Sequence, residues 1–304
     1  MNDLSIDLGK GFKIANPVLT ASGTFGYGDE VSEVVDVNRF GGIVTKSLSL
    51  EPRIGNPPPR IVETPSGMIN SIGLANIGLE AFLKEKAPYL NQLTCNVIIN
   101  IAARTEEEFC DVIKMLDNEK WISAYEINVS CPNVKEGGIA FGTDPDVLRR
   151  LTQKLRDRTD RYLIVKLSPN VTNIAQMAEI VQECNADAVS MINTLYGAAI
   201  DIHTRKPKIN TVIGGLSGPA IKPAALAHII KARKVIDIPI IGIGGISNGE
   251  DVIEFMLAGA SAVQLGTVNF YNPCAIYEIL NFIEQYMTQY KITSLQKIIG
   301  QALV

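Results

Sequence analysis

Short apolar runs alternate with longer amphipathic stretches along almost the whole chain. The apolar runs are rich in valine and isoleucine, which is typical of parallel strands covered on both faces. The expected strands are Pro17–Ala21, Gly42–Lys46, Asn96–Asn100, Ala124–Val129, Leu163–Leu167, Ala188–Asn193, Pro239–Ile243 and Ala262–Leu265. The expected helices are Glu30–Val37, Leu79–Leu90, Glu106–Leu116, Pro145–Arg158, Ile174–Glu183, Pro223–Val235, Glu250–Leu257 and Ala275–Tyr290.

This even alternation predicts the α/β class and, within it, a (β/α)8 TIM barrel formed by residues 1–304 as a single domain. A doubly wound open sheet is the alternative, but the strand count and the regular order favour the barrel. Asp144 before Pro145, and Asn248 before Gly249, are residues that start helices.

Three segments extend this plan. Leu4–Asn16 alternates polar and apolar residues and predicts a hairpin that closes the bottom of the barrel. Ser47–Gly78 and Leu195–Lys222 are long insertions after the second and sixth strands. Both leave the carboxyl ends of their strands, where barrels place their active-site loops.

Composition narrows the class of protein further. Hydrophobic residues make up 46% of the 304 residues and charged residues 20%, so a large core is expected and disorder is not. The net charge of −4 makes a nucleic-acid partner a poor guess. The chain has no apolar run long enough to span a membrane, and its N-terminus lacks the layout of a signal peptide. A cytoplasmic protein is expected.

The five cysteines are odd in number and widely spaced, and they form no Cys-x-x-Cys pair. A metal or iron–sulfur site within this chain is therefore not expected, and reduced thiols fit better than disulfides. The histidines are His203 and His228, and His228 falls in a helical pattern. Acid–base chemistry is expected to use another residue type.

Cys131 lies in the segment Glu126-Ile-Asn-Val-Ser-Cys-Pro-Asn133, where Pro132 must end the strand. A thiol on a loop held by a strand end can act as a base or nucleophile, although most free cysteines are small buried hydrophobes. Polar residues gather at the other strand ends too. They are Ser22, Lys46, Asn100, Asn128, Lys166, Ser168, Asn193 and Thr194.

A single asparagine at such a position is usually a turn residue, but turns do not explain the whole set. Lys166 follows the apolar residues Leu163-Ile-Val165, so it needs a partner. One interpretation is a salt bridge to a strand carboxylate such as Glu126. The other is a positive charge beside a group that becomes anionic during turnover.

A phosphate site is expected at the last two strands. Ile243-Gly-Gly-Ile-Ser-Asn-Gly249 opens a helix, and Gly266-Thr267 follows the neighbouring strand. Glycines let the backbone approach a ligand closely, and N–H groups at a helix start bind anions. Barrels often hold phosphate in the loops after strands seven and eight.

Together these segments resemble the dihydroorotate dehydrogenases over nearly the whole chain. The segments that carry the resemblance are Asn16-Pro-Val-Leu-Thr-Ala-Ser-Gly23, Val44-Thr-Lys-Ser47, Gly55-Asn-Pro-Pro-Pro-Arg60, Asn70-Ser-Ile-Gly-Leu74, Asn128-Val-Ser-Cys-Pro-Asn133, Asn193-Thr194, Gly214-Gly-Leu-Ser-Gly-Pro219 and Ile243-Gly-Gly245. Pro59-Arg-Ile-Val-Glu-Thr-Pro65, Asn193-Thr-Leu195 and Gly214–Pro223 are most similar to the class 1B catalytic subunit.

The resemblance implies an FMN-binding barrel that oxidises dihydroorotate to orotate in pyrimidine biosynthesis, with Cys131 as the base. The FMN phosphate would sit on Gly244, Gly245, Gly266 and Thr267. The residues lining the flavin would be Ser22, Lys46, Ser47, Asn100, Asn128, Lys166, Ile192 and Gly218. The substrate would contact Lys46, Asn70, Ser71, Ile72, Gly73, Leu74, Asn128, Asn193 and Thr194.

It also implies a homodimer core with a second subunit that carries FAD and an iron–sulfur cluster and passes electrons to NAD, giving a heterotetramer. Two departures from the family pattern stand out. Ala103 replaces an expected glycine after Asn100, which puts the shape of that loop in doubt. Leu74-Ala-Asn-Ile-Gly78 stands where a glutamine and a proline are expected.

Other functions stay open at this stage. A class 1A homodimer would use fumarate without a partner, and a related flavoprotein would act on another dihydropyrimidine. A non-redox phosphate-binding barrel, such as a synthase or isomerase, would be colourless. A purely structural role leaves the lysines, asparagines and cysteine of the strand ends unexplained.

Overall fold

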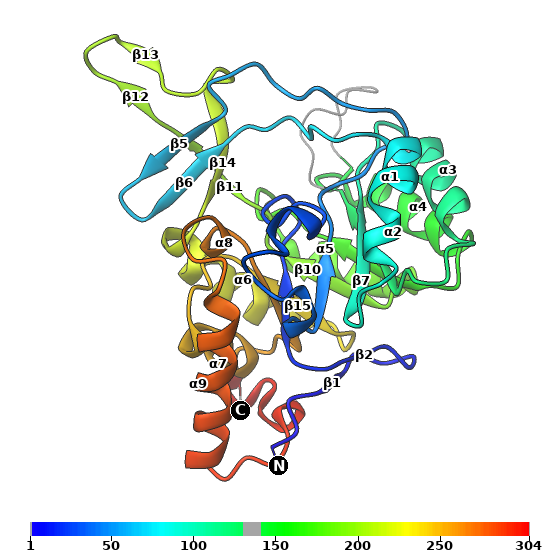
Figure 1. The fold of residues 1–304 in the computed structure, drawn as a ribbon, viewed down its shortest axis with the longest axis vertical. Coiled ribbons are helices and arrows are strands. Elements are labelled where there is room, and N and C mark those ends of the chain that lie inside the picture. Colours follow the sequence, from blue (N-terminus) through cyan, green and yellow to red (C-terminus); the bar gives the residue numbers. More distant parts are fainter. Residues whose placement is uncertain (1, 130–140, 304) are drawn as a thin grey trace.

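A computed structural model describes residues 2–129 and 141–303 of the chain. Its centre is a closed barrel of eight parallel strands (Figure 1), which confirms the predicted barrel against the open sheet. The strands are β3 (Val18–Thr20), β4 (Gly42–Val44), β7 (Asn96–Ile101), β8 (Ala124–Asn128), β9 (Tyr162–Lys166), β10 (Ala188–Met191), β15 (Ile240–Ile243) and β16 (Ala262–Leu265). The ring closes where β16 pairs with β3.

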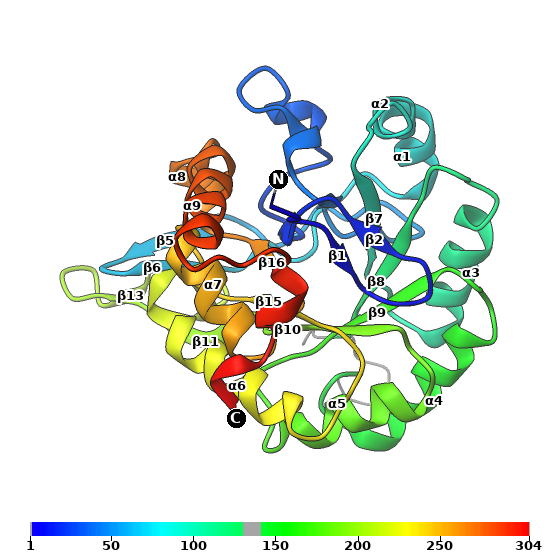
Figure 2. The same ribbon diagram turned by 90° about the horizontal axis from the view of Figure 1, so that it is seen from below.

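Helices surround the barrel, as the view from below shows (Figure 2). They are α1 (Leu79–Glu85), α2 (Ala87–Leu90), α3 (Glu106–Leu116), α4 (Pro145–Arg156), α5 (Ile174–Glu183), α6 (Lys222–Arg233), α7 (Gly249–Leu257), α8 (Val268–Tyr271) and α9 (Ala275–Gln289). The Asp144 side chain caps α4 and the Asn248 side chain caps α7, as predicted. No helix in the described part of the chain is long and apolar enough to cross a membrane.

Two of the helix predictions were wrong in part. The segment Glu30–Val37 forms no α-helix but two short 3-10 turns, Asp29–Val31 and Val37–Arg39. Its valines have low helix propensity, and the Asp36 side chain accepts a hydrogen bond from Asn38 N, which starts the second turn. The segment Leu79–Leu90 divides into α1 and α2 next to Pro88, whose nitrogen cannot donate a helical hydrogen bond. Further 3-10 turns are Pro219–Ile221, Leu295–Ile298 and Gln301–Leu303.

The N-terminal hairpin covers the amino-terminal end of the barrel, as the sequence predicts. Its strands β1 (Ile6–Asp7) and β2 (Lys13–Ile14) pair antiparallel. The Phe12 ring stacks on Tyr162 at the start of β9, with ring centroids 4.4 Å apart. The Tyr162 hydroxyl donates to the Leu8 carbonyl oxygen at 2.6 Å, so the hairpin is fastened by both apolar and polar contacts.

The two long insertions join in one antiparallel sheet that the sequence does not predict. The first insertion supplies β5 (Ile61–Thr64) and β6 (Gly67–Asn70), and the second supplies β11 (Leu195–Ala198) and β14 (Ile213–Ser217). The strand order is β11-β14-β6-β5, so β14 and β6 pair across the two insertions. The sheet lies beyond the barrel at its carboxyl-terminal end (Figure 1).

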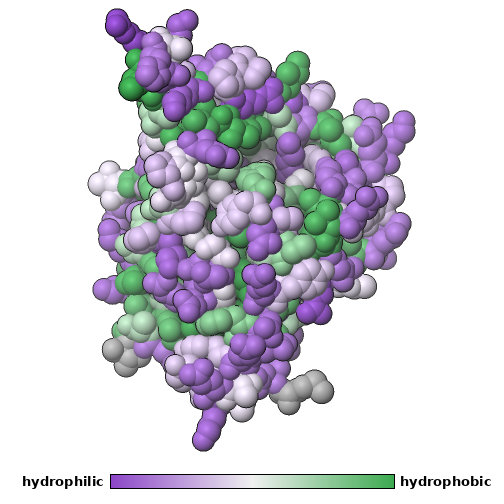
Figure 3. Space-filling view, turned by 60° about the vertical axis from the view of Figure 1, so that its left-hand side comes forward, coloured by the Kyte–Doolittle hydropathy of each residue, from purple (hydrophilic) through white to green (hydrophobic). Residues whose placement is uncertain are grey.

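A small hairpin, β12 (Ile200–Asp201) and β13 (Lys206–Pro207), projects from this sheet. Ile200 and Ile202 in the hairpin, and Ile213 in β14, are exposed apolar residues. Figure 3 shows apolar and hydrophilic surface intermixed around this projection. The sheet is therefore only partly covered by the rest of the chain.

Candidate active site

The barrel brings the predicted site residues to one rim. Because all eight strands are parallel, their carboxyl ends meet at the same end of the barrel. The predicted residues on or directly after these strand ends are Ser22, Lys46, Ser47, Asn100, Asn128, Lys166, Ile192, Asn193, Thr194, Gly244, Gly245, Gly266 and Thr267. Cys131 lies outside the described residues.

A chain of hydrogen bonds links three of these residues across neighbouring strands. The Ser22 and Ser47 hydroxyl oxygens lie 3.3 Å apart. The Ser47 hydroxyl donates to Asn100 Oδ1 at 2.6 Å, and Asn100 Nδ2 donates to Glu126 Oε1 at 2.7 Å. Asn100 and Glu126 are fully buried, so this chain runs from the rim into the barrel interior.

Glu126 is the centre of a polar cluster inside the barrel. Its Oε2 accepts hydrogen bonds from Ser190 Oγ at 2.8 Å and from Gln264 Nε2 at 2.5 Å. Lys166 Nζ lies 3.8 Å from Glu126 Oε1, and both side chains are buried. The salt bridge, one of the two interpretations of Lys166, is therefore present, and it leaves room for the other because Lys166 ends β9 at the rim.

Ser190 and Gln264 belong to this cluster, and the sequence analysis missed both. Each is a polar residue between apolar neighbours in a buried strand, Val189-Ser-Met191 and Val263-Gln-Leu265. Buried polar groups are normally hydrogen-bonded, so a polar residue inside such a strand is a usable signal. The same signal had drawn attention to Lys166.

The asparagines predicted to hold a substrate come together in part. Asn193 Nδ2 lies 3.5 Å from Asn128 Oδ1, and Thr194 N donates to Asn193 Oδ1 at 2.8 Å. Asn70, at the end of β6, donates to the Gly215 carbonyl oxygen at 3.4 Å. A Cβ atom at Gly215 would collide with the Thr194 side chain, so β14 lies directly against this part of the rim.

Residues 71–74 are held by their own insertion. Asn56 Nδ2 donates to Ser71 Oγ at 2.8 Å, and Asn56 N donates to the Ile72 carbonyl oxygen at 3.0 Å. Gly73 and Leu74 have φ values of +74° and +56°, so the chain turns sharply after Ile72. The structure gives this segment a defined shape, while its contact with a substrate stays a prediction.

The glycine loops form a tight cradle at the rim. Gly245 has a φ of +74°, and a Cβ atom there would lie 2.8 Å from the Gly218 carbonyl oxygen and 2.9 Å from Lys222 N. A Cβ atom at Gly266 would instead meet one neighbour, Ala21 Cβ, at 3.7 Å. Thr267 Oγ1 donates to Ser217 Oγ at 2.8 Å. The close backbone approach at Gly245 and the absence of a crowded neighbour at Gly266 fit an anionic group such as a phosphate.

Asp251 in α7 holds this loop in place. Its carboxylate accepts hydrogen bonds from Ser247 N at 2.8 Å and Ser247 Oγ at 2.9 Å, and Lys222 Nζ lies 2.7 Å away. Burial favours the neutral acid, but these hydrogen bonds outweigh it and hold the pKa of Asp251 below its usual value. The loop after β15 is thus anchored to both α6 and α7.

The departure at Ala103 has little structural effect. Ala103 is buried and is not among the residues with positive φ, so the backbone there does not require glycine. Asn100 keeps its hydrogen bonds to Ser47 and Glu126. The doubt about the shape of this loop is therefore removed.

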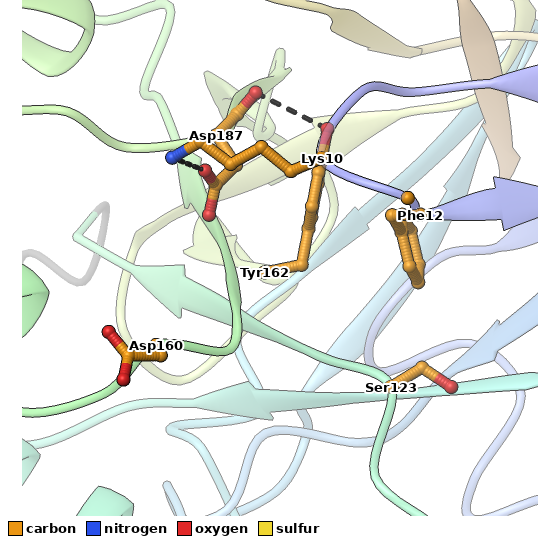
Figure 4. A pocket seen from close by; sticks show the side chains of 7 residues that line it. Lys10, Phe12, Ser123, Asp160, Tyr162 and Asp187 are labelled. Atoms are coloured by element: carbon orange, nitrogen blue, oxygen red, sulfur yellow. Dashed lines mark hydrogen bonds and ion pairs between the residues drawn. The ribbon is translucent and has the colours of Figure 1, made fainter.

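A separate cavity of about 210 Å³ lies at the opposite end of the barrel (Figure 4). Lys10 and Phe12 of the hairpin line it together with Asp160, Tyr162 and Asp187. Asp187 pairs with Lys10 and, at 2.7 Å, with Arg156 Nη1. These contacts fasten the hairpin, and none of the predicted site residues reaches this cavity.

The sequence and the fold can be compared with those of known proteins. The family model described as dihydroorotate dehydrogenase matches residues 8–287. The chain is 49% identical over 298 residues to the dihydroorotate dehydrogenase B (NAD(+)) catalytic subunit of Citrifermentans bemidjiense, covering 98% of this chain and 97% of that protein. It is 50% identical over 298 residues to the protein of the same name from Geobacter sulfurreducens, with the same coverage.

A solved structure has a similar fold at lower identity. The dihydroorotate dehydrogenase of Eimeria tenella, crystallised with ferulenol, superposes with a TM-score of 0.81 and 22% identity. The match covers 98% of this chain and 88% of that one. At this identity the likeness supports the barrel architecture alone.

Proposed function

This chain belongs to the dihydroorotate dehydrogenase family, and from that premise we propose that it is the catalytic subunit of an NAD-linked dihydroorotate dehydrogenase. It oxidises dihydroorotate to orotate in the de novo synthesis of UMP. The observation that carries this proposal is near 49% identity over 98% of the chain to catalytic subunits of that name. The same relatives favour NAD over fumarate as the final acceptor.

The family is flavin-dependent, and we propose FMN as the flavin of this chain. The cradle of Gly244, Gly245, Gly266 and Thr267 would bind its phosphate, and the close backbone approach at Gly245 and the uncrowded position of Gly266 support this. The residues that would line the flavin are Ser22, Lys46, Ser47, Asn100, Asn128, Lys166, Ile192 and Gly218. When bound, FMN would accept the hydride that leaves C6 of dihydroorotate.

The residues of this chain would supply the base, the contacts to the substrate and a positive charge beside the flavin. Cys131 takes the proton from C5, for which the thiolate is the active form. The amides of Asn70, Asn128 and Asn193 hydrogen-bond the ring and the carboxylate of the substrate. Thr194 and the segment Ser71–Leu74 also contact the substrate, and Lys46 lies near it. Lys166 places a positive charge where negative charge accumulates at the N1–O2 edge of the reduced flavin.

The name of the relatives as catalytic subunits implies a separate partner subunit. We propose that this partner carries FAD and an iron–sulfur cluster, and that two copies of this chain form the core of a cytoplasmic heterotetramer. Residues 1–304 would act as one FMN-binding domain in it. The single closed barrel, with both insertions joined in one sheet at its carboxyl-terminal end, supports the single-domain assignment.

The absorbance spectrum of protein purified from its own host tests the proposal. A flavin band that bleaches on anaerobic addition of dihydroorotate is the expected result, and an iron–sulfur shoulder beneath it would indicate the partner. A flavin band that does not bleach would point to another reduced substrate. A colourless protein would contradict the oxidoreductase assignment.

A further inference from the structure

Glu126 is a buried carboxylate in the barrel for which the proposed reaction has no use. Its side chain has no exposed area, and strands β7, β9, β10 and β16 all supply groups that contact it. Burying a charge is costly unless it is paired and hydrogen-bonded. Packing alone does not account for a fully buried carboxylate with hydrogen-bond donors on both oxygens.

The first consequence of the carboxylate concerns the direction of hydrogen bonds. An ionised carboxylate can only accept, so Asn100 must turn its Nδ2 toward Glu126 and its Oδ1 toward Ser47. The Ser47 hydroxyl therefore gives its proton to Asn100, and Ser22 becomes the donor in the contact with Ser47 at 3.3 Å. Glu126 thus fixes the orientation of three residues that we assign to the flavin site.

The second consequence concerns charge. Lys166 Nζ lies 3.8 Å from Glu126 Oε1, which is longer than a hydrogen bond, so this contact acts mainly through charge. In a buried environment such an interaction is stronger than in water. The carboxylate offsets part of the positive potential that Lys166 presents at the rim, where a reduced flavin gains negative charge.

We propose that Glu126 is a positioning residue of the flavin site, which orients Asn100 and, as a counter-ion of Lys166, lowers the midpoint potential of the bound flavin. The inference rests on the proposed flavin site. Glu126 is buried too deep to contact the substrate, and it acts on the site through Asn100 and Lys166.

The variant Glu126→Gln tests this role because it keeps the shape of the side chain and removes its charge. Without the negative charge of Glu126, Lys166 should shift the equilibrium toward the reduced flavin at least about tenfold, which raises the midpoint potential by at least about 30 mV for a two-electron couple. Anaerobic redox titration of the flavin-loaded full chain measures this shift. A potential equal to that of the wild type would overturn the proposal.

Asp187→Asn is the matched control. Asp187 is also a buried carboxylate with cationic partners, but it precedes β10 at the opposite end of the barrel. Its loss should leave the flavin potential unchanged even where it lowers stability. If Asp187→Asn shifted the midpoint potential as much as Glu126→Gln does, the potential would depend on general destabilisation, and the proposal would fail.

A second pair of variants covers the case in which Glu126→Gln does not fold. Removing both members of a buried ion pair is often tolerated where removing one is not. Lys166→Met should lower the flavin potential, and Lys166→Met with Glu126→Gln should bring it back toward the wild-type value. A double variant with a potential as low as that of Lys166→Met alone would contradict the counter-ion role.

Failure of the proposed function gives a different result. If the wild-type chain binds no flavin, or its flavin is not reduced by dihydroorotate, the proposed function is wrong before any variant is compared. If the wild-type chain passes both tests and the variants do not change its potential, the role of Glu126 alone is wrong.

Discussion

At the scale of single residues, burial sets the reactivity of three cysteines in the described part of the chain. Burial raises the pKa of Cys95 to about 11, and it also raises the pKa of Cys110 and Cys184. These thiols stay protonated at neutral pH and are poor bases, since the thiolate is the reactive form. None of the three is suited to take a proton from a substrate.

Replacement of Cys131 by serine should therefore have an effect that replacement of Cys95 does not. We expect Cys131→Ser to retain flavin and bind orotate but to be reduced by dihydroorotate at least about 100-fold more slowly, because a general base is lost. Anaerobic stopped-flow absorbance measures the rate, with Cys95→Ser as the control. Reduction of Cys131→Ser at the wild-type rate at neutral pH would contradict the assignment of the base.

Sequence reasoning at this scale was good at strand ends and weak inside strands. Asn100 was found because it ends an apolar run, and Lys166 was found because a charged residue in an apolar strand is conspicuous. Ser190 and Gln264 were missed because their role depends on a carboxylate from another strand. No local pattern shows which side chains will meet in the middle of a barrel.

At the scale of elements, the loop between β15 and α7 is held by the Asp251 carboxylate, which pairs with Lys222 and accepts two hydrogen bonds from Ser247. The lowered pKa of Asp251 means that the folded chain stabilises the ionised carboxylate more than the unfolded chain does. The stability that this group contributes is present above its unfolded pKa of about 3.9 and is lost as the pH falls through its lower folded value. Acid should therefore loosen this loop.

Asp251→Asn should produce at neutral pH the same loss that acid produces in the wild type. We expect the free energy of unfolding to fall by about 1–3 kcal/mol, because the hydrogen bond to Lys222 loses its charge, and flavin content to fall with it. Urea unfolding and the flavin-to-protein ratio measure the two effects. Glu254→Gln removes the half-exposed partner of the same lysine and should change stability by less than about 1 kcal/mol. Equal losses in both variants would refute this account.

The barrel elements were predictable because each strand and helix carries its own periodic pattern. All eight predicted strands are present, with ends that differ from the prediction by at most two residues. The helix prediction for Glu30–Val37 was wrong because the apolar spacing of this segment resembles a helix, while its valines and the Asp36 side chain favour turns. The sheet of β11, β14, β6 and β5 was missed because its strands are short and pair across distant segments.

At the scale of the whole molecule, the proposed reaction divides between two kinds of subunit. We expect the isolated chain, loaded with flavin, to be reduced by dihydroorotate without reducing NAD, because it has no expected site for the second electron carrier. Absorbance at 340 nm follows NADH, and co-expression with the partner subunit should restore its formation. Sustained turnover of the isolated chain with fumarate would instead favour the class 1A alternative.

The pairing of β14 with β6 also bears on how the chain is made. Protein synthesis delivers residues in order, so the hairpin β5–β6 emerges long before its partner β14. Until the second insertion has left the ribosome, one edge of β6 has no strand to pair with, and Asn70 has not yet met Gly215. The part of the rim that we propose for the substrate is therefore completed only after six of the eight barrel strands have been synthesised, and a nascent chain that stalls earlier exposes a strand edge open to wrong partners.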